Sequence, residues 1–363
     1  MTTPMTDFRF YPATTNYSKP VGRTLFQNNI LWCALSGSGI AFSFTGKKLS
    51  VEIKGDDRVL SMEQAVQIEK ARIAFYVDGN RVIEDMVISP EKTYSIIEAA
   101  ETETHLIQII KLSESPMSVV GISKIITDEN ATLHPALEKP RKIEFIGDSI
   151  TCGYGVDDSE LTHTFSTATE DVTKAYAYQT AHALNADYSM VSYSGYGIYS
   201  GYTEGTRNTS ELVPPFYTKI GFSRGLVNGQ PITMTEWDFQ SYQPDLIVLN
   251  LGTNDDSYCQ DFEERQTEFI AHYQQFLQTI REKNPKAYIL CTYGIMNQRM
   301  NPCIKKAIDS YQTESKDEKV SFVPLALQLE SDGYVVDYHP SIITHIKAAT
   351  TLADKIREIM KWE

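Results

Sequence analysis

Long apolar runs are missing from the chain. No segment of the 363 residues approaches the roughly 20 consecutive apolar residues that a membrane-spanning helix needs. The first twenty residues also lack the apolar core of a secretion signal. Together these absences favour a cytoplasmic protein, and a secreted chain whose leader had been removed is the alternative.

Cysteine is scarce and scattered. The five thiols form an odd set without a Cys-x-x-Cys pair, which disfavours both a disulfide framework and a zinc site. We therefore expect reduced thiols and no bound metal. The five residues are Cys33, Cys152, Cys259, Cys291 and Cys303.

Basic residues are also fewer than acidic ones. The chain has 33 basic and 47 acidic residues, which gives a formal net charge of −14. An acidic chain without basic clusters argues against binding to nucleic acid or to anionic membranes. The composition fits a protein that acts on neutral molecules, and 42% hydrophobic residues suffice for two sizeable cores.

The first third of the chain has a strand-like pattern. Short apolar runs alternate with turn signals, such as "TGKK" and the Asp78-Gly79 pair, and no long amphipathic helix interrupts them. This pattern predicts a β-sandwich over residues 1–127. A polar stretch with two prolines predicts a linker over residues 128–141.

From residue 142 onward, predicted strands alternate with predicted helices. The clearest helix covers residues 262–283, where apolar side chains recur at helical spacing. A last helix follows Ser341, a suitable N-cap. This alternation predicts an α/β domain over residues 142–363, with a parallel sheet covered by helices on both faces.

An apolar run that stops abruptly marks the start of this second domain. In "KIEFIGDSITCGYG" a short predicted strand ends at Gly147, and Asp148 and Ser149 are good helix-start residues. One interpretation is a plain helix cap. The other is a reactive serine at the carboxyl end of a strand, where α/β folds place their chemistry.

Three later loops also follow predicted strands. They contain Gly195 in "YSGYG", Asn254 in "LGTND" and His339 in "DYHPS". Each has a plain interpretation as a turn, a cap or a surface histidine. Together with Ser149 they supply what acyl transfer needs: a nucleophile, a base, and donors from two backbone N–H groups and one amide for an oxyanion.

These four blocks resemble the SGNH, or GDSL-type, hydrolases. "FIGDSIT", "YSGYG", "LGTND" and "DYHPS" match the four family blocks in the right order. The resemblance covers residues 142–363, and it implies that Ser149 and His339 are catalytic and that Ser149, Gly195 and Asn254 form the oxyanion site. It also implies that no metal or cofactor takes part.

The whole chain resembles carbohydrate esterase family 2, in which a jelly-roll domain precedes the SGNH domain. Besides the blocks above, "THTFSTATED" and "YSGYGIY" contribute to this resemblance. It implies a serine esterase, of the acetyl xylan esterase type, that removes O-acetyl groups from saccharides derived from plant polysaccharides. Without a leader, acetylated xylan or glucomannan oligosaccharides are the expected partners.

One departure concerns the third member of the triad. The general pattern places Asp three residues before His, but Val336 stands there, and Asp337 is only two residues before His339. Either Asp337 or a backbone carbonyl therefore orients the histidine. The resemblance favours the carbonyl, because the esterase family tolerates loss of the third side chain.

Several further residues have weaker signals. Tyr338 and Trp237 are candidate walls for a sugar ring, because aromatic faces stack on sugars. Cys152 is expected to be a packing residue, and His163 and His345 are expected to be solvated.

Two rival functions remain. One is a lipase or thioesterase of the same fold with another acyl substrate. The other is a carbohydrate-binding protein with an idle catalytic domain, against which the joint presence of the four block residues argues.

Overall fold

The computed structural model describes residues 8–63, 66 and 68–363. The chain forms two compact units. The N-terminal unit comprises Met1–Glu138 and Ile220–Thr235, and the parallel-sheet unit comprises Lys139–Lys219 and Glu236–Glu363. Among the described residues, no helix combines the length and apolar character needed to cross a bilayer.

The N-terminal unit is built from antiparallel strands. They are β1 (Phe8–Tyr11), β2 (Lys19–Val21), β3 (Thr24–Gln27), β4 (Ile30–Cys33), β5 (Gly39–Gly55), β6 (Arg72–Val77), β7 (Asn80–Met86), β8 (Glu91–Lys111), β9 (Val120–Asp128) and β10 (Thr132–Pro135). Short elements complete the unit: η1 (Asp57–Leu60), β13 (Leu226–Val227), β14 (Gln230–Pro231) and η4 (Ile232–Met234).

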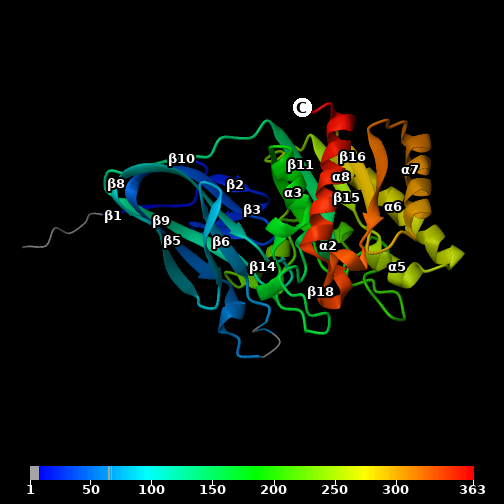
Figure 1. Ribbon diagram of the computed structural model, residues 1–363, viewed down its shortest axis with the longest axis horizontal. Helices are drawn as coiled ribbons and strands as arrows, with labels where there is room; N and C mark the ends of the chain where they lie inside the picture. The colour runs from blue at the N-terminus through cyan, green and yellow to red at the C-terminus, as the bar shows by residue number, and fades with distance from the viewer. Residues whose placement is uncertain (1–7, 64–65, 67) are drawn as a thin grey trace, which may run out of the picture. The chain divides into compact units, whose positions relative to one another are not determined.

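The two longest strands, β5 and β8, pair with each other along most of their length (Figure 1). The first part of β5 pairs with β2 and β10, and its second part pairs with β9. Side chains from both parts, among them Phe42, Phe44, Val51 and Ile53, share one buried core. The predicted β-sandwich is therefore confirmed.

Two local predictions in this unit had different outcomes. The Asp78-Gly79 pair forms the expected hairpin turn between β6 and β7, and both residues have positive φ angles. The predicted hairpin at "TGKK" is wrong, because β5 continues through it with a register shift between Gly46 and Lys48. A bulge bends a strand without ending it, and sequence pattern does not distinguish the two.

The expected domain boundaries differ from the two units at two places. Strand β10 lies within the expected linker and pairs with Phe42–Thr45 of β5. The segment Ile220–Thr235 belongs to the N-terminal unit, although it follows the start of the second domain in sequence. There the Leu226 N–H donates to the Asp57 carboxylate at 2.6 Å, a contact across 169 residues of sequence.

The parallel-sheet unit has five central strands in the order β12-β11-β15-β16-β17. They are β11 (Arg141–Gly147), β12 (Ala186–Ser192), β15 (Leu246–Asn250), β16 (Tyr288–Ile295) and β17 (Val320–Leu327), with a small antiparallel pair, β18 (Tyr334–Val335) and β19 (His339–Pro340). Strand β15 is buried along its whole length. All neighbouring pairs of the five are parallel, as predicted.

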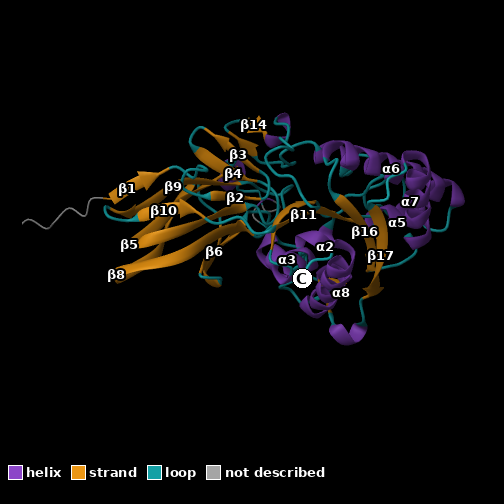
Figure 2. Cartoon of the chain, turned by 90° about the horizontal axis from the view of Figure 1, so that it is seen from above, coloured by secondary structure: helices purple, strands orange, loops and turns teal. Residues whose placement is uncertain are grey.

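Helices cover both faces of this sheet (Figure 2). Helices α2 (Ser149–Cys152), α3 (Tyr176–Ala183) and α8 (Ile342–Met360) lie on one face, and α5 (Thr253–Cys259), α6 (Glu263–Lys283) and α7 (Asn301–Ser315) lie on the other. The shorter elements are α4 (Pro214–Tyr217), η2 (Thr167–Thr169), η3 (Val172–Lys174), η5 (Glu330–Asp332) and η6 (Val336–Tyr338). The predicted α/β architecture is confirmed, and α6 begins one residue after the expected position.

Candidate active site

The strand order brings three loops to one edge of the parallel sheet. Gly147, the last residue of β11, pairs with Ser192 of β12 on one side and with Asn250 of β15 on the other. The loops that leave these three strand ends therefore start side by side. This is the switch point of a doubly wound sheet, where such folds bind their ligands.

Ser149 is the first residue of the one-turn helix α2. The Asp148 side chain caps the helix by accepting the Ile150 N–H at 3.1 Å. Ser149 is only 5% exposed. Burial raises the pKa of Asp148 to about 7, and the nearby Asp255 carboxylate acts in the same direction. Asp148 thus fixes the turn that presents Ser149.

His339 lies beside Ser149, although 190 residues separate them in the chain. Its Nε2 atom is 2.9 Å from the Ser149 Oγ atom. His339 comes directly before the N-terminus of α8, where the Ser341 side chain caps the helix and donates to the Asp332 carbonyl at 2.7 Å. The serine and histidine that the sequence singled out are therefore in hydrogen-bond contact.

The environment of His339 favours a neutral ring. Burial lowers its pKa to about 4, while the Asp337 charge and the carbonyls of Asp337 and Val336 act to raise it. At neutral pH the ring is uncharged, so Nε2 can accept a proton from Ser149. No residue that the structure describes forms a hydrogen bond with Nδ1.

Tyr154 covers one face of the His339 ring, and the sequence analysis did not identify it. The two rings stack with centroids 4.2 Å apart, and Phe165 stacks on Tyr154 at 3.9 Å. The Tyr154 hydroxyl donates to the Asp337 carboxylate at 2.8 Å. The only signal in the sequence was its place in the block "GDSITCGYG", five residues after Ser149.

The conformation of η6 determines where Asp337 points. Asp337 and Tyr338 both have positive φ angles, 53° and 58°, which non-glycine residues rarely adopt. Val336 is fully buried, and its side chain occupies the space where a Cβ on Gly155 would lie, 2.1 Å from Val336 Cγ1. Val336 therefore anchors the turn, while the carboxylate of Asp337 reaches the Tyr154 hydroxyl.

Gly195 and Asn254 lie in the other two loops. Gly195 has a φ of +83°, and its carbonyl accepts the Tyr202 N–H at 2.8 Å. Asn254, in the first turn of α5, donates from Nδ2 to the Tyr196 carbonyl at 2.8 Å. An amide NH₂ has two hydrogens, so one remains for another acceptor.

Asp255 is a second residue whose role the sequence did not predict. One of its carboxylate oxygens accepts the backbone N–H groups of residues 198–200 at 3.0, 2.6 and 2.9 Å. These bonds hold the loop that follows Gly195. Burial raises the pKa of Asp255 to about 6, and the three N–H groups oppose that rise. Asp255 therefore fastens the Gly195 loop to α5.

The remaining sequence candidates occupy different environments. Tyr338 is 60% exposed next to His339. Trp237 is half-buried, and its backbone N–H donates to the Thr218 carbonyl at 2.7 Å. Cys152 is buried against the Ser192 hydroxyl, and His163 is exposed beside Asp158, as expected. All five cysteines are free and buried.

The expectation that His345 is solvated is wrong. His345 is buried in α8, its Nδ1 accepts the Tyr176 N–H at 3.2 Å, and burial lowers its pKa to about 3. Its spacing from Ala348, Ala349 and Leu352 places it on the apolar face of the helix. That spacing was a signal available in the sequence.

A doubly wound sheet with a Ser–His pair at its switch point is an arrangement found in hydrolases that use a serine nucleophile. The family model of the GDSL-like lipase/acylhydrolase family matches residues 145–345. The chain therefore belongs to this family. The model of the carbohydrate esterase 2 N-terminal domain matches residues 20–136.

Individual relatives extend the similarity to both units. The cellulase/esterase CelE of Acetivibrio thermocellus is 31% identical over 343 residues, which are 91% of this chain and 38% of that protein. An acetylxylan esterase/glucomannan deacetylase of Cellvibrio japonicus is 27% identical over 90% of this chain and 86% of that protein. The chain thus spans about two fifths of the first relative and most of the second.

A solved structure is similar over nearly the whole chain. It is the acetyl xylan esterase Est2A from Butyrivibrio proteoclasticus, which has a TM-score of 0.87 and 25% identity and covers 98% of this chain and 99% of that one. The resemblance to family 2 carbohydrate esterases is therefore confirmed for sequence and fold together.

Proposed function

We propose that this protein is a serine esterase that removes O-acetyl groups from saccharides derived from plant polysaccharides. The observation that carries the proposal is the 2.9 Å contact between His339 Nε2 and Ser149 Oγ at the switch point of the sheet. Acetylated xylan and glucomannan oligosaccharides are the proposed substrates, and the names of the relatives in C. japonicus and B. proteoclasticus support this choice.

Acylation begins with proton transfer. Neutral His339 takes the Ser149 proton at Nε2 while Oγ attacks the acetyl carbonyl carbon. The carbonyl π electrons move to oxygen, and the N–H groups of Ser149 and Gly195 and the remaining amide hydrogen of Asn254 stabilise the oxyanion. When the tetrahedral intermediate collapses, protonated His339 gives its proton to the leaving sugar oxygen.

Deacylation repeats these steps with water. His339 takes a proton from water, the resulting hydroxide attacks the acetyl group on Ser149, and the second intermediate releases acetate and the Ser149 hydroxyl. The lowered pKa of His339 leaves the ring neutral at neutral pH, so its Nε2 atom is free to accept a proton when each attack starts.

The orientation of His339 is assigned to backbone carbonyls of the η6 turn. The Asp337 carboxylate already accepts the Tyr154 hydroxyl, whereas the carbonyls of Val336 and Asp337 both favour a positive charge on the ring. Catalytic hydrogen bonds are often loose before substrate binds, so we expect one of these carbonyls to accept Nδ1–H during turnover.

Several finer predictions stay predictions. Tyr338, exposed beside His339, is the proposed wall for the sugar ring, and Trp237 is a second candidate. The jelly-roll strand connection and the cytoplasmic location also stay predictions from the sequence, and five free, buried thiols fit a reducing compartment.

The test is acetate release by purified Ser149→Ala from acetylated xylan, acetylated glucomannan and monosaccharide acetates. We expect turnover to disappear while the circular dichroism spectrum stays that of the wild type. Ser241→Ala, at an exposed serine before β15, is the matched control and should keep full activity. Near-normal acetate release by Ser149→Ala would contradict the serine mechanism.

A second measurement separates the esterase from a lipase of the same fold. Aryl acetate, butyrate and octanoate are compared by kcat/KM, because a small acyl pocket rejects longer chains. A preference for octanoate would overturn the assignment to acetyl groups and leave the Ser149 mechanism intact.

A further inference from the structure

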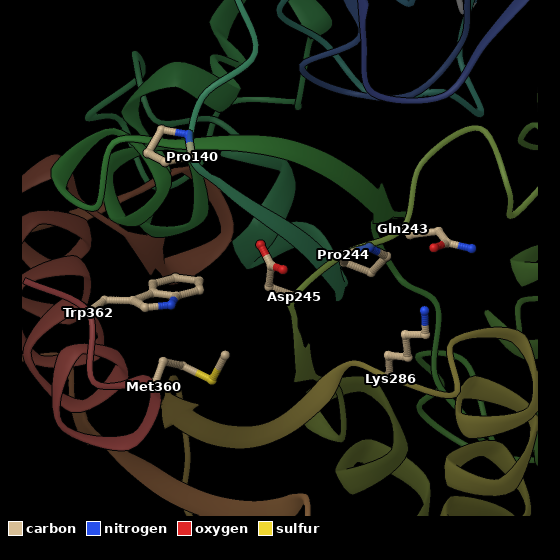
Figure 3. Close-up of a pocket in the computed structure, with 7 residues that line it drawn as sticks. All are labelled: Pro140, Gln243, Pro244, Asp245, Lys286, Met360 and Trp362. Atoms are coloured by element: carbon tan, nitrogen blue, oxygen red, sulfur yellow. The ribbon is translucent and has the colours of Figure 1, made fainter.

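A cavity of about 390 Å³ lies where the strands of the parallel sheet begin, at the end opposite the Ser–His pair (Figure 3). Its lining mixes apolar and polar side chains: Pro140, Gln243, Pro244, Asp245, Lys286, Met360 and Trp362. The volume is in the range of pockets that bind small molecules. None of these residues takes part in the chemistry proposed for Ser149.

The topology separates this cavity from the Ser–His pair. Pro140 directly precedes β11, and Ser149 follows it, so the length of the strand lies between them, roughly 20 Å at about 3.3 Å per residue. Asp245 likewise precedes β15. Helix α8 starts beside His339 and runs back across the sheet, which brings Trp362 to this edge.

The Trp362 ring is held in place before any ligand binds. The Arg141 guanidinium lies over the ring, 5.3 Å from a ring centroid. Arg141 also donates to the Leu184 carbonyl at 2.8 Å and to the Glu363 carbonyl at 2.7 Å. An indole that is already ordered loses little conformational entropy when a flat apolar ligand face packs on it.

The polar side chains offer hydrogen-bond donors and acceptors without a net charge. Asp245 accepts the Lys142 N–H at 2.8 Å with one carboxylate oxygen and has a second oxygen. Across the cavity lies Lys286, for which no ion pair is found among the described residues. One carboxylate and one ammonium balance, so the lining selects neither an anion nor a cation.

We propose that this cavity binds a pyranose unit of a neutral saccharide, as a second carbohydrate site distinct from the reactive one. Trp362 and Met360 lie on one side of Asp245, and Gln243 and Lys286 lie on the other (Figure 3). The apolar face of one pyranose fits Trp362 and Met360 and its hydroxyl groups fit Asp245, while Gln243 and Lys286 can bind the hydroxyl groups of a neighbouring unit. That the bound sugar belongs to the polymer being deacetylated rests on the proposed function. Binding itself does not depend on Ser149.

Such a site increases the rate of deacetylation of polymers and leaves the hydrolysis of small esters unchanged. A chain held at this edge raises the local concentration of its own acetyl groups at Ser149. An aryl acetate has no sugar to hold, so its hydrolysis is independent of the cavity. This difference makes the site measurable.

The experiment compares wild type with Trp362→Ala by affinity electrophoresis in deacetylated glucomannan and by kcat/KM on an aryl acetate. We expect binding to weaken about tenfold or more, as for loss of a buried aromatic anchor, with aryl acetate hydrolysis unchanged. Trp362→Phe should restore part of the binding. Unchanged binding in Trp362→Ala overturns the proposal.

A second variant keeps the test decisive if Trp362→Ala misfolds. If Trp362→Ala loses activity on the aryl acetate too, the double variant with Gln243→Ala and Lys286→Ala decides, because both side chains are exposed. Normal binding by that variant overturns the proposal, as does tighter binding of a glucuronate-containing oligosaccharide than of the neutral polymer. If Ser149→Ala stays active, the proposed function fails but the binding result still stands.

Discussion

Polar side chains at the two ends of the parallel strands, here called the carboxyl edge and the amino edge of the sheet, differ in their exposure to solvent. At the carboxyl edge, Asp148, Ser149, Asn254 and Asp255 are all buried, each less than 8% exposed. At the amino edge, Gln243, Asp245 and Lys286 are exposed. The same strands therefore begin in a solvated environment and end in a desolvated one.

Burial at the carboxyl edge changes the chemistry of its groups. It raises the pKa of Asp148 and Asp255 and lowers that of His339, because each charged form loses hydration. Buried donors and acceptors are also fixed in position before substrate arrives, which is what stabilisation of a developing oxyanion requires. Variants at this edge should therefore alter catalysis, and matched variants at the amino edge should not.

The largest effect is expected from His339→Ala. Loss of the base should reduce kcat on an aryl acetate by about 10⁴-fold, since the oxyanion donors alone retain part of the rate. Lys286→Ala, at the amino edge, is the matched control and should keep the wild-type kcat. Equal losses in the two variants would remove the distinction between the edges.

Asn254→Ala should reduce kcat by roughly 10²–10³-fold, or about 3–4 kcal/mol of transition-state stabilisation. The backbone donors of Ser149 and Gly195 remain, so activity should stay measurable. Steady-state kinetics on one aryl acetate provide the measurement. A change confined to KM would assign Asn254 to substrate binding instead.

Activity should persist in mild acid because His339 must be neutral to act as a base. With its pKa lowered to about 4, most of the ring is still uncharged at pH 5, whereas an ordinary histidine would be about 97% protonated. We expect kcat/KM on an aryl acetate to stay near its plateau from pH 7 to pH 5 and to fall near pH 4. A fall centred near pH 6.5 would contradict the effect of burial.

The same shift has a consequence for stability. The unfolded chain binds a proton at His339 near pH 6.5, before the folded protein does, so this residue favours unfolding as pH falls from about 6.5 toward 4. Circular dichroism at each pH therefore accompanies the kinetics. His345, with a pKa near 3, acts in the same direction.

Asp337→Asn should lose less than about tenfold in kcat, on the order of 1.4 kcal/mol. Its carboxylate accepts the Tyr154 hydroxyl, and backbone carbonyls remain for Nδ1. The measurement is kcat at neutral pH beside that of His339→Ala. If Asp337→Asn falls as far as His339→Ala, Asp337 is the third member of a triad.

Tyr154→Phe should have the smallest effect, about two- to threefold in kcat. It keeps the aromatic ring on His339 and removes the hydroxyl bond to Asp337, an exposed bond worth about 1 kcal/mol. The pH profile of kcat/KM is the more sensitive readout. A loss beyond tenfold would show that this hydroxyl positions the η6 turn.

Local pattern was enough to predict the elements that present the site. Apolar runs and turn residues located β11, β15 and α8, and Asp78-Gly79 located a hairpin, because each depends on a few neighbouring residues. The blocks around Ser149 and His339 identified the pair that the structure brings to 2.9 Å.

Local pattern was not enough where a contact joins distant parts of the chain. Three features depend on partners tens to hundreds of residues away: the register shift within β5, the placement of Ile220–Thr235 in the N-terminal unit and the stacking of Tyr154 on His339.

The sequence by itself determined the two-part architecture, the parallel sheet and the identity of the Ser–His pair, since hydrophobic period and short motifs carry that information. Only the tertiary structure decided that Val336 is an anchor, that Asp337 pairs with Tyr154 and that Trp362 lines a cavity. The physical reason is that side-chain direction and desolvation are set by packing, through the positive φ angles of η6 and the return of α8 across the sheet.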